Sequence, residues 1–348
     1  MTTEQVTAIE WCIYKKIPFF VFRDVYHKKM LFSAAPSALD ENMPVPKRGF
    51  FINSFATPHE QNIWIPFELS AKDVLDRRKS LCGYTGADIE PWKESTGHDT
   101  YINKVSALID RLKTAPDEKT VISCTESIYS PEWPLDSAID WMFSTSREIC
   151  TFAFYHPKTG FWLGATPELL LHHDIKKDIY ISYSLAGTQT NDDIEWSDKN
   201  SREHNIVTRY ICDVFDRFGI PYITDIDDAP YGGFHHKLTR IAGTGGTGSF
   251  FEILDVLSPT PALCGFPKEQ ALNDIAKIED HPRRCYGGYV GLRDNDTETA
   301  YVTIRCAQNL GSYYTVYGGG GIIGLSDAEE EWDEAMMKID TVAEIMNL

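Results

Sequence analysis

The amino-acid sequence predicts an α+β fold in which antiparallel β-sheets are flanked by helices. Two series of strand-like segments, at residues 149–185 and 285–318, alternate with short hairpin-like connections and predict two strand meanders. Apolar periodicity also predicts helices between and after these strands. The expected helices lie at residues 101–113, 136–143, 197–218, around 275–278 and from 326 onward. Three further short strands are expected near the N-terminus, at Phe19–Phe22, Gly49–Ile52 and Ile63–Phe67.

The composition and net charge limit the kinds of partner that the protein is expected to bind. The chain has 348 residues and a formal net charge of −18, so neither nucleic acid nor an anionic membrane is an expected partner, because both bind basic patches. An anionic substrate would have to be held by a few local cations or by a metal ion. The eight cysteines are scattered without metal-binding spacing, which favours reduced thiols. The sequence shows neither a signal peptide nor a membrane-spanning segment, and we therefore predict a cytoplasmic protein.

The most unusual stretch is a run of four glycines and the helix after it. Gly318–Gly321 follow an apolar segment and predict a strand end without side chains, which a ligand or another backbone can approach closely. Ser326–Glu329 has the pattern of a capping box that opens a helix. In that helix Glu331, Glu334 and Lys338 recur at i, i+3 and i+7, on one line beside the apolar stripe. They predict a metal-assisted site for a small anion or, on their own, a solvated acidic face.

Two other carboxylates stand in apolar surroundings. Glu168 interrupts an apolar sheet segment, so it needs a cation or a raised pKa. A catalytic acid and a satisfied buried glutamate are equal alternatives for it. Glu203 falls within the apolar face of the helix at 197–218, where a lone carboxylate is costly unless it is paired or bound to a metal. The sequence slightly favours a functional role for Glu203.

Two cations are candidates on weaker grounds. Alternation along the predicted strand at 300–307 places Arg305 on one face with Tyr301 and Thr303, beside the glycine strand. There it is either a carboxylate clamp or a surface cross-strand residue. Lys119 begins a strand, and that segment alone favours a solvated edge residue.

One glycine-rich stretch has the spacing of a cofactor-binding motif, but we do not interpret it as a cofactor site. Gly243–Gly248 has the spacing GxGxxG of dinucleotide-binding loops. The preceding segment, His235–Arg240, is not the apolar buried strand that such a unit requires, and several prolines interrupt the sequence after it. A nicotinamide enzyme is therefore not expected.

Ten short motifs, taken in order, resemble those of chorismate-utilising enzymes, and most closely those of isochorismate synthases. They are Glu118–Ser123, Gly164–Leu170, Ser184–Thr188, Arg202–Val207, His236 with Thr239, Pro259–Gly265, Arg283 with Tyr286–Gly288, Val302–Ala307, the glycine run, and Glu331–Glu334 with Lys338. The resemblance covers residues 117–348. It implies one chorismate-binding catalytic domain over residues 1–348, of which residues 1–100 are a divergent part.

The resemblance implies a fold of two large antiparallel β-sheets stacked face to face and flanked by helices, with the site between them. It implies Mg²⁺ bound by Glu203 and Glu334 with Glu331 nearby, a ligand set of the kind that Mg²⁺ prefers. The residues that would line the rest of the substrate pocket are Gly187, Ala262, Arg305, Gly319 and Lys338.

Two positions distinguish the reactions within the family. The resemblance implies that Lys119 activates water, because amine-adding members have glutamine there, and that Glu168 protonates the leaving hydroxyl. Ala186 stands where aminodeoxychorismate synthases carry a lysine nucleophile. The implied reaction is the Mg²⁺-dependent isomerisation of chorismate to isochorismate, a step of menaquinone or siderophore biosynthesis, without a glutamine amidotransferase subunit. A salicylate synthase and a non-catalytic chorismate-binding subunit are the alternatives.

Overall fold

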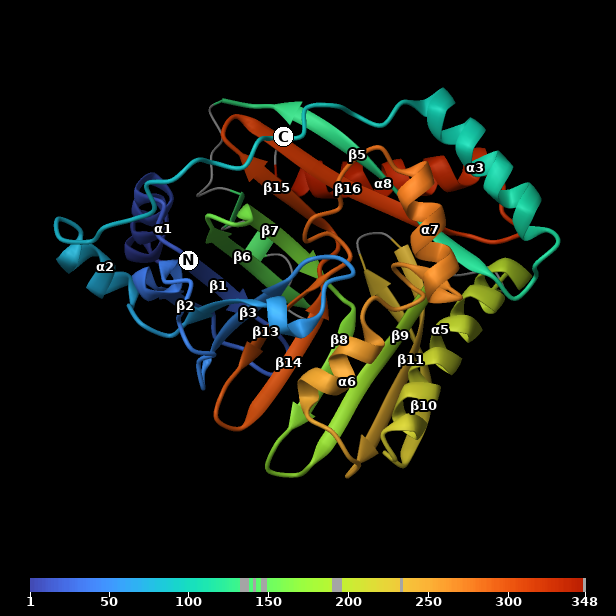
Figure 1. Cartoon of the computed structure of the whole chain (residues 1–348), viewed down its shortest axis with the longest axis horizontal. Helices are drawn as coiled ribbons and strands as arrows, with labels where there is room; N and C mark the ends of the chain where they lie inside the picture. Colours follow the sequence, from blue (N-terminus) through green and yellow to red (C-terminus); the bar gives the residue numbers. More distant parts are fainter. Residues whose placement is uncertain (132–137, 140–141, 145–148, 190–195, 232–233, 347–348) are drawn as a thin grey trace.

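The computed structural model describes residues 1–131, 138–139, 142–144, 149–189, 196–231 and 234–346. Within them the chain forms two eight-stranded sheets in which every paired strand is antiparallel to its neighbour (Figure 1). The first sheet has the order β12 (Gly265–Phe266), β5 (Lys119–Tyr129), β16 (Tyr313–Ile322), β15 (Cys306–Leu310), β7 (Gly160–Thr166), β6 (Cys150–His156), β1 (Phe19–Arg23) and β2 (Leu31–Ala34). The second has the order β10 (Tyr222–Tyr231), β11 (Phe234–Thr244), β9 (Ile179–Gln189), β8 (Leu169–Asp174), β14 (Thr297–Val302), β13 (Tyr289–Arg293), β3 (Gly49–Asn53) and β4 (Ile63–Pro66).

Three apolar cores hold four layers together. The middle core lies between the two sheets and is rich in aromatic rings, among them Phe20, Phe50, Phe154 and Trp162. The outer core of the first sheet is covered by α1 (Thr3–Lys15), α2 (Ala71–Arg77), α3 (His98–Leu112), α7 (Lys268–Ile278) and α8 (Ala328–Met346). The outer core of the second sheet is covered by α5 (Asp198–Arg217) and α6 (Phe250–Leu257). The predicted α+β fold of two stacked antiparallel sheets with flanking helices is therefore confirmed.

Local patterns located many elements correctly. The three N-terminal strands are β1, β3 and β4, and they join both sheets, because β1 pairs with β6 and β3 pairs with β13. The helix predicted at 197–218 is α5, which begins after the N-cap Ser197 and is followed by Gly219 at a φ of 64°. The helix expected at 136–143 lies largely outside the described residues. The GxGxxG run begins within the last residues of β11, which is antiparallel to both of its neighbours, so it does not open a βαβ unit.

Neither of the two predicted meanders forms a single sheet, because each is divided between the two sheets. The first meander passes from the first sheet to the second between β7 and β8, and the second meander passes from the second sheet to the first between β14 and β15. The predicted strand at 300–307 is thus two strands in different sheets. Hydrogen bonds join the two chain segments in which these crossovers occur. The Val302 amide donates to the Glu168 carbonyl at 3.0 Å, and the Ala165 amide donates to the Arg305 carbonyl at 3.1 Å. The sheets are consequently joined at one point by two adjacent chain segments.

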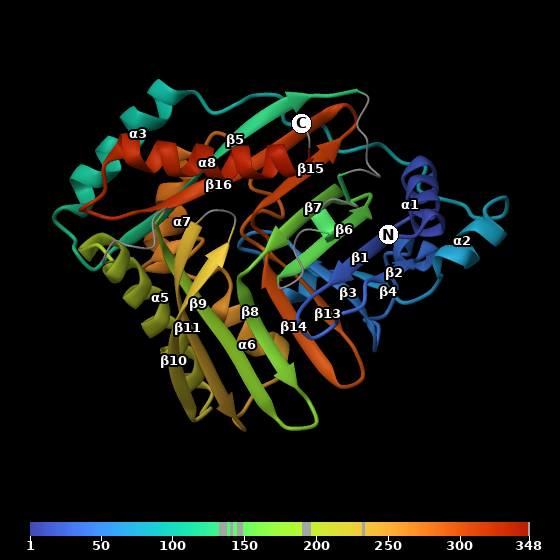
Figure 2. The same ribbon diagram turned by 180° about the vertical axis from the view of Figure 1, so that it is seen from behind.

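The glycine run lies within β16, toward its C-terminal end, and is the strand end without side chains that the sequence predicts. It pairs with β5 along its whole length, from Gly318 opposite Cys124 to Gly321 opposite Val121. Helix α8 lies directly on this part of the sheet (Figure 2). A Cβ atom added at Gly318 would come within 2.2 Å of the Ala335 carbonyl oxygen. The missing side chains therefore let a helix, as well as a ligand, approach the strand.

The start of α8 differs from the predicted capping box. Asp327 Oδ1 accepts hydrogen bonds from the amides of Glu329 and Glu330, at 3.0 and 3.2 Å. Ser326 Oγ instead accepts one from the Ile323 amide, at 3.1 Å. A carboxylate at the N-terminus of a helix also interacts favourably with the positive end of the helix dipole.

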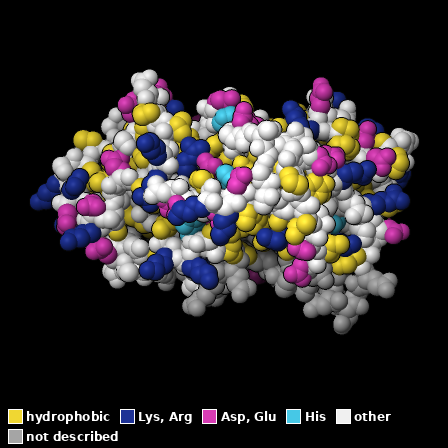
Figure 3. Space-filling view, turned by 90° about the horizontal axis from the view of Figure 1, so that it is seen from below, with side chains coloured by type: hydrophobic (Ala, Val, Ile, Leu, Met, Phe, Trp, Pro, Cys, Tyr) yellow, Lys and Arg dark blue, Asp and Glu magenta, His cyan; other side chains and the backbone are white. Residues whose placement is uncertain are grey.

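The surface carries charges of both signs. On the face shown in Figure 3, basic and acidic side chains are interspersed with apolar ones. In the described part of the chain no helix combines the length and the apolar character needed to cross a lipid bilayer.

We expect Gly318→Ala to destabilise the protein by roughly 1–3 kcal/mol, because the new methyl group would overlap backbone that cannot move without shifting α8. Urea-induced unfolding of the purified variant measures this. Gly97→Ala is the matched control, because a Cβ there meets no atom closer than 3.7 Å. The control should lose no more than about 1 kcal/mol, because Gly97 is the N-cap of α3 and Ala is a poorer cap than Gly. Equal stabilities of the two variants would contradict the close packing of α8 on β16.

Candidate active site

A cavity of about 90 Å³ opens where the two crossovers, the glycine strand and helices α5 and α8 meet. Nine of the residues proposed from the sequence line it: Lys119, Glu168, Gly187, Glu203, Ala262, Arg305, Gly319, Glu334 and Lys338. Glu331 is the exception, because it lies buried beside the cavity rather than in its wall. The structure thus brings together side chains from distant parts of the chain.

Lys119 and Glu203 meet over the bare strand. Lys119 is 3% exposed, so it is not the solvated edge residue that its segment alone suggested. Its Nζ lies 3.5 Å from Glu203 Oε1. A Cβ atom at Gly321 would lie 1.9 Å from that oxygen and 2.5 Å from Lys119 Cε. Any side chain at Gly321 would therefore separate this pair.

Glu334 and Lys338 form a second pair on the same wall. Lys338 Nζ donates to Glu334 Oε1 at 2.6 Å and to the Gly319 carbonyl at 2.7 Å, which ties α8 to β16. Burial alone would raise the pKa of Glu334, but the positive charge of Lys338, supported by Lys199, outweighs it and lowers the pKa to about 2. Glu334 is therefore a carboxylate at neutral pH.

Glu168 and Arg305 come from the two crossovers. Burial raises the pKa of Glu168 to about 8, against the opposing positive charges of Lys119 and Lys338. Glu168 is therefore largely protonated at neutral pH and can donate a proton. Arg305 is buried and has a φ of 48°, between the end of β14 and the start of β15. The predicted strand position of Arg305 is thus wrong, because the chain changes sheet there, but its side chain does line the cavity.

Two residues near the cavity were not proposed as site residues from the sequence. His236 lines it, and burial together with the charge of Arg305 lowers the pKa of this histidine to about 3, so it is uncharged. Lys199 Nζ lies 2.6 Å from Glu331 Oε1 and 4.0 Å from Glu334 Oε2. One signal could have found Lys199: it precedes Glu203 by four positions on α5, which places both on one helix face.

Glu331 is the most deeply buried of the carboxylates. It is 0% exposed, and burial raises its pKa to about 7, with Glu334 and Glu203 adding to the rise and Lys199 opposing it. The carboxylates of Glu203, Glu331 and Glu334 therefore act on one another. In addition, Glu203 Oε1 is buried and accepts no hydrogen bond from the described residues, although Lys119 Nζ lies 3.5 Å away. Such an unsatisfied oxygen next to further carboxylates fits a hard divalent cation such as Mg²⁺.

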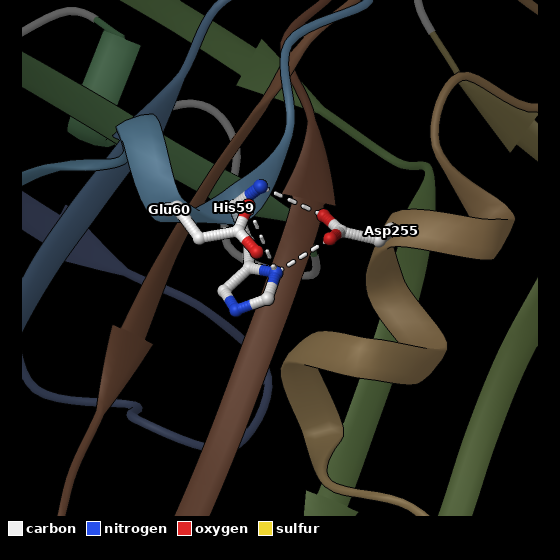
Figure 4. Close-up of side chains that lie close together, drawn as sticks. All are labelled: His59, Glu60 and Asp255. Carbon is white, nitrogen blue, oxygen red and sulfur yellow. Dashed lines mark hydrogen bonds and ion pairs between the residues drawn. The ribbon is translucent and has the colours of Figure 1, made fainter.

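A second group of possible metal ligands lies elsewhere. In the described residues His59, Glu60 and Asp255 bring their ligand atoms within 4.8 Å of one another (Figure 4). Both Asp255 oxygens already accept hydrogen bonds from His59, from its amide at 2.8 Å and from Nδ1 at 2.5 Å. Glu60 is 70% exposed and lies 3.8 Å from that ring nitrogen. We interpret this group as a contact that fastens the segment after β3 to α6.

The family model described as chorismate binding enzyme matches residues 85–347. Isochorismate synthase EntC of Escherichia coli strain K12 is 29% identical over 236 residues, which cover 61% of this chain and 59% of that relative. The matched region thus spans about three fifths of EntC. Isochorismate synthase DhbC of Bacillus subtilis strain 168 is 29% identical over 326 residues, or 82% of this chain and 80% of that protein.

Solved structures share the fold. A putative 2,3-dihydroxybenzoate-specific isochorismate synthase, DhbC from Bacillus anthracis, superposes with a TM-score of 0.75 at 21% identity, covering 98% of this chain and 100% of that one. MenF, the menaquinone-specific isochorismate synthase from Escherichia coli, gives a TM-score of 0.76 at 17% identity over 99% of this chain and 91% of that one. Because the family model matches most of the sequence, the chain belongs to the family of chorismate binding enzymes.

Proposed function

We propose that this protein is an isochorismate synthase, which isomerises chorismate to isochorismate with Mg²⁺ as cofactor. The observation that carries the proposal is a single cavity that holds a buried lysine, Lys119, and a buried, protonated glutamic acid, Glu168. An amine that can take a proton and a carboxylic acid that can give one are the two groups needed to exchange one hydroxyl for another. The similarity to proteins named isochorismate synthase supports the same reaction.

The substrate is a dicarboxylate, and the charges around the cavity suit it. Arg305 and Lys338 both line the cavity, and a guanidinium is the cation best matched to a carboxylate. His236 is uncharged, so it can form hydrogen bonds with the substrate and does not repel the nearby cations Arg305 and Lys338. Gly187, Ala262 and Gly319 complete the wall with little or no side chain. A protein with a net charge of −18 can hold a dianion in this way, because the cations are local.

The ligands proposed for Mg²⁺ are Glu203 and Glu334, with Glu331 as their neighbour. Their oxygen atoms are the ligand type that this ion prefers, and the buried oxygen of Glu203 that accepts no hydrogen bond from the described residues supports the assignment. When bound, the ion would supply positive charge for the ring carboxylate of the substrate.

Lys119 is proposed as the general base. In its uncharged form the amine takes a proton from water, while the water oxygen forms a bond to C2 of the ring. The ring double bonds shift, and the bond from C4 to its hydroxyl oxygen breaks. Glu168 gives its proton to that leaving oxygen, so that water is released and one hydroxyl has replaced another. Both residues return to their starting states by proton exchange with solvent.

The reaction can be identified directly in ¹⁸O-labelled water. Purified protein incubated with chorismate and Mg²⁺ should form isochorismate with the label in the new C2 hydroxyl, detected by chromatography and mass spectrometry. Ammonium salts should yield no anthranilate, because Lys119 stands where amine-adding relatives have glutamine. Salicylate with pyruvate as the main product would instead indicate a salicylate synthase. Binding of chorismate without turnover would indicate a non-catalytic subunit.

Replacement of either proton-transfer residue should remove most of the activity. We expect Lys119→Gln and Glu168→Gln each to lower kcat by a factor on the order of 10²–10⁴, the usual contribution of a positioned acid or base. In the parent enzyme kcat/KM should fall as pH rises through about 8, because the raised pKa keeps Glu168 protonated below that value and the acid is lost above it. The pH profile from 6 to 10 checks the sign. A rate that keeps rising to pH 10, or a near-native Glu168→Gln enzyme, would contradict the role of Glu168.

The proposed metal ligands can be tested one carboxylate at a time. Glu203→Gln and Glu334→Gln should each weaken Mg²⁺ binding at least about 10-fold, since changes to outer-shell partners alone already cost that much. Isothermal titration calorimetry measures the affinity, and circular dichroism checks that the variants fold. Glu330→Gln is the control, because it removes the same charge from an exposed position of α8. Full turnover in excess EDTA would rule out a metal-dependent site.

A further inference from the structure

Around the proposed metal site each carboxylate has its own lysine. Lys119 Nζ lies 3.5 Å from Glu203, Lys338 Nζ lies 2.6 Å from Glu334, and Lys199 Nζ lies 2.6 Å from Glu331. The proposed reaction uses Lys119 and Lys338. It assigns nothing to Lys199, which does not line the cavity.

Lys199 faces the whole carboxylate group rather than one member. It lies in the first turn of α5, and its side chain is 20% exposed. Its Nζ reaches Glu334 Oε2 at 4.0 Å as well as Glu331, and Glu203 follows one helical turn later on the same face. The geometry thus places the Lys199 amine against two carboxylates of α8 at once.

The Glu331 carboxylate, which pairs with Lys199, has no access to solvent water. Glu331 is fully buried, and among the described residues Lys199 is the cation that pairs with it. An unpaired charge in such a place is strongly destabilising. The ligand atoms of Glu203, Glu331 and Glu334 also do not gather within the 4.8 Å span that the group at His59 meets. A lysine lies against each of the three carboxylates.

We infer that Lys199 is an internal counter-cation that stabilises the three carboxylates before Mg²⁺ arrives and then competes with the metal for them. The inference rests on the proposed metal site. Two cations next to the same carboxylates repel each other, so the bound metal must overcome the attraction of Lys199 for Glu331 and Glu334. Lys199 therefore makes the metal-free protein more stable and the metal easier to release. If Lys199 only positioned Glu331 as a ligand, its removal would weaken metal binding instead.

A counter-cation and a residue that only positions Glu331 predict opposite changes in Mg²⁺ affinity when the charge of Lys199 is removed. In Lys199→Met, which keeps the length of the side chain without its charge, we expect Mg²⁺ to bind about 10-fold more tightly, a change of about 1.4 kcal/mol. Isothermal titration calorimetry with MgCl₂ alone measures it on the full-length protein, without substrate. The Tm of this variant should fall in EDTA and return toward the parent value in saturating Mg²⁺. The parent protein should show a smaller increase in Tm with Mg²⁺.

Lys237→Met is the matched control for loss of charge near α5. Lys237 Nζ donates to Ser201 Oγ at 3.2 Å, on the same helix, and it is not paired with any of the three carboxylates. Its Mg²⁺ affinity should stay within about 2-fold of the parent value, whereas an increase equal to that of Lys199→Met would show a general charge effect and overturn the inference. If Lys199→Met does not fold, Lys199→Arg decides the question. It keeps the charge, so binding of Mg²⁺ tighter than in the parent protein would overturn the inference.

The outcomes separate this inference from the proposed function. Equal or weaker Mg²⁺ binding by Lys199→Met, with normal binding by the parent protein, overturns the role of Lys199 and leaves the metal site intact. Absence of Mg²⁺ binding by the parent protein overturns both.

Discussion

The close approach of helix α8, and of the Glu203 side chain from α5, to a strand without side chains is the constraint on which the site depends. At Gly318 the strand leaves room for the backbone of α8, and at Gly321 it leaves room for the Lys119–Glu203 pair. A single methyl group at either position would push apart layers that are otherwise densely packed. Because α5 and α8 meet at this strand, their carboxylates lie close enough to influence one another's protonation. The apolar cores on both sides keep water from screening these charges.

The second requirement is that opposite charges are buried together. Glu203, Glu331 and Glu334 would each be unfavourable alone, and each has a lysine at 2.6–3.5 Å. Among the described residues no ion pair is seen for Glu168, and burial raises its pKa to about 8. One cavity thus contains the ionised carboxylate of Glu334, with Lys338 at 2.6 Å, and the neutral carboxylic acid of Glu168. Acid–base chemistry and metal binding both need this separation of protonation states.

The two chain crossovers place the remaining polar groups. Antiparallel strands within one sheet turn by short hairpins, whereas a chain that passes from one sheet to the other must break its ladder. The breaks occur after β7 and after β14, and they leave Glu168 and Arg305 outside regular strands. Hydrogen bonds between the flanks of the two breaks hold these residues side by side. Loops held by a rigid scaffold are common places for functional residues.

The sequence by itself determined what depends on neighbouring residues. Apolar periodicity located β1, β3, β4 and α5, and the spacing of Glu331, Glu334 and Lys338 placed them correctly on one side of α8. The ordered motifs predicted the family, which the match over residues 85–347 confirms. The roles of the site residues, the metal and the reaction remain proposals.

Only the tertiary structure decided which strands share a sheet and which charges share a pocket. Alternation along residues 300–307 could not show that the chain changes sheets before Arg305, because both strands have the same local pattern. The sequence did not single out Lys199, because its partner Glu331 lies on another helix, α8. Side-chain periodicity records burial on one element, whereas ion pairs between elements depend on how the layers pack. That packing depends on contacts between residues far apart in the chain, and the pattern of neighbouring residues does not record them.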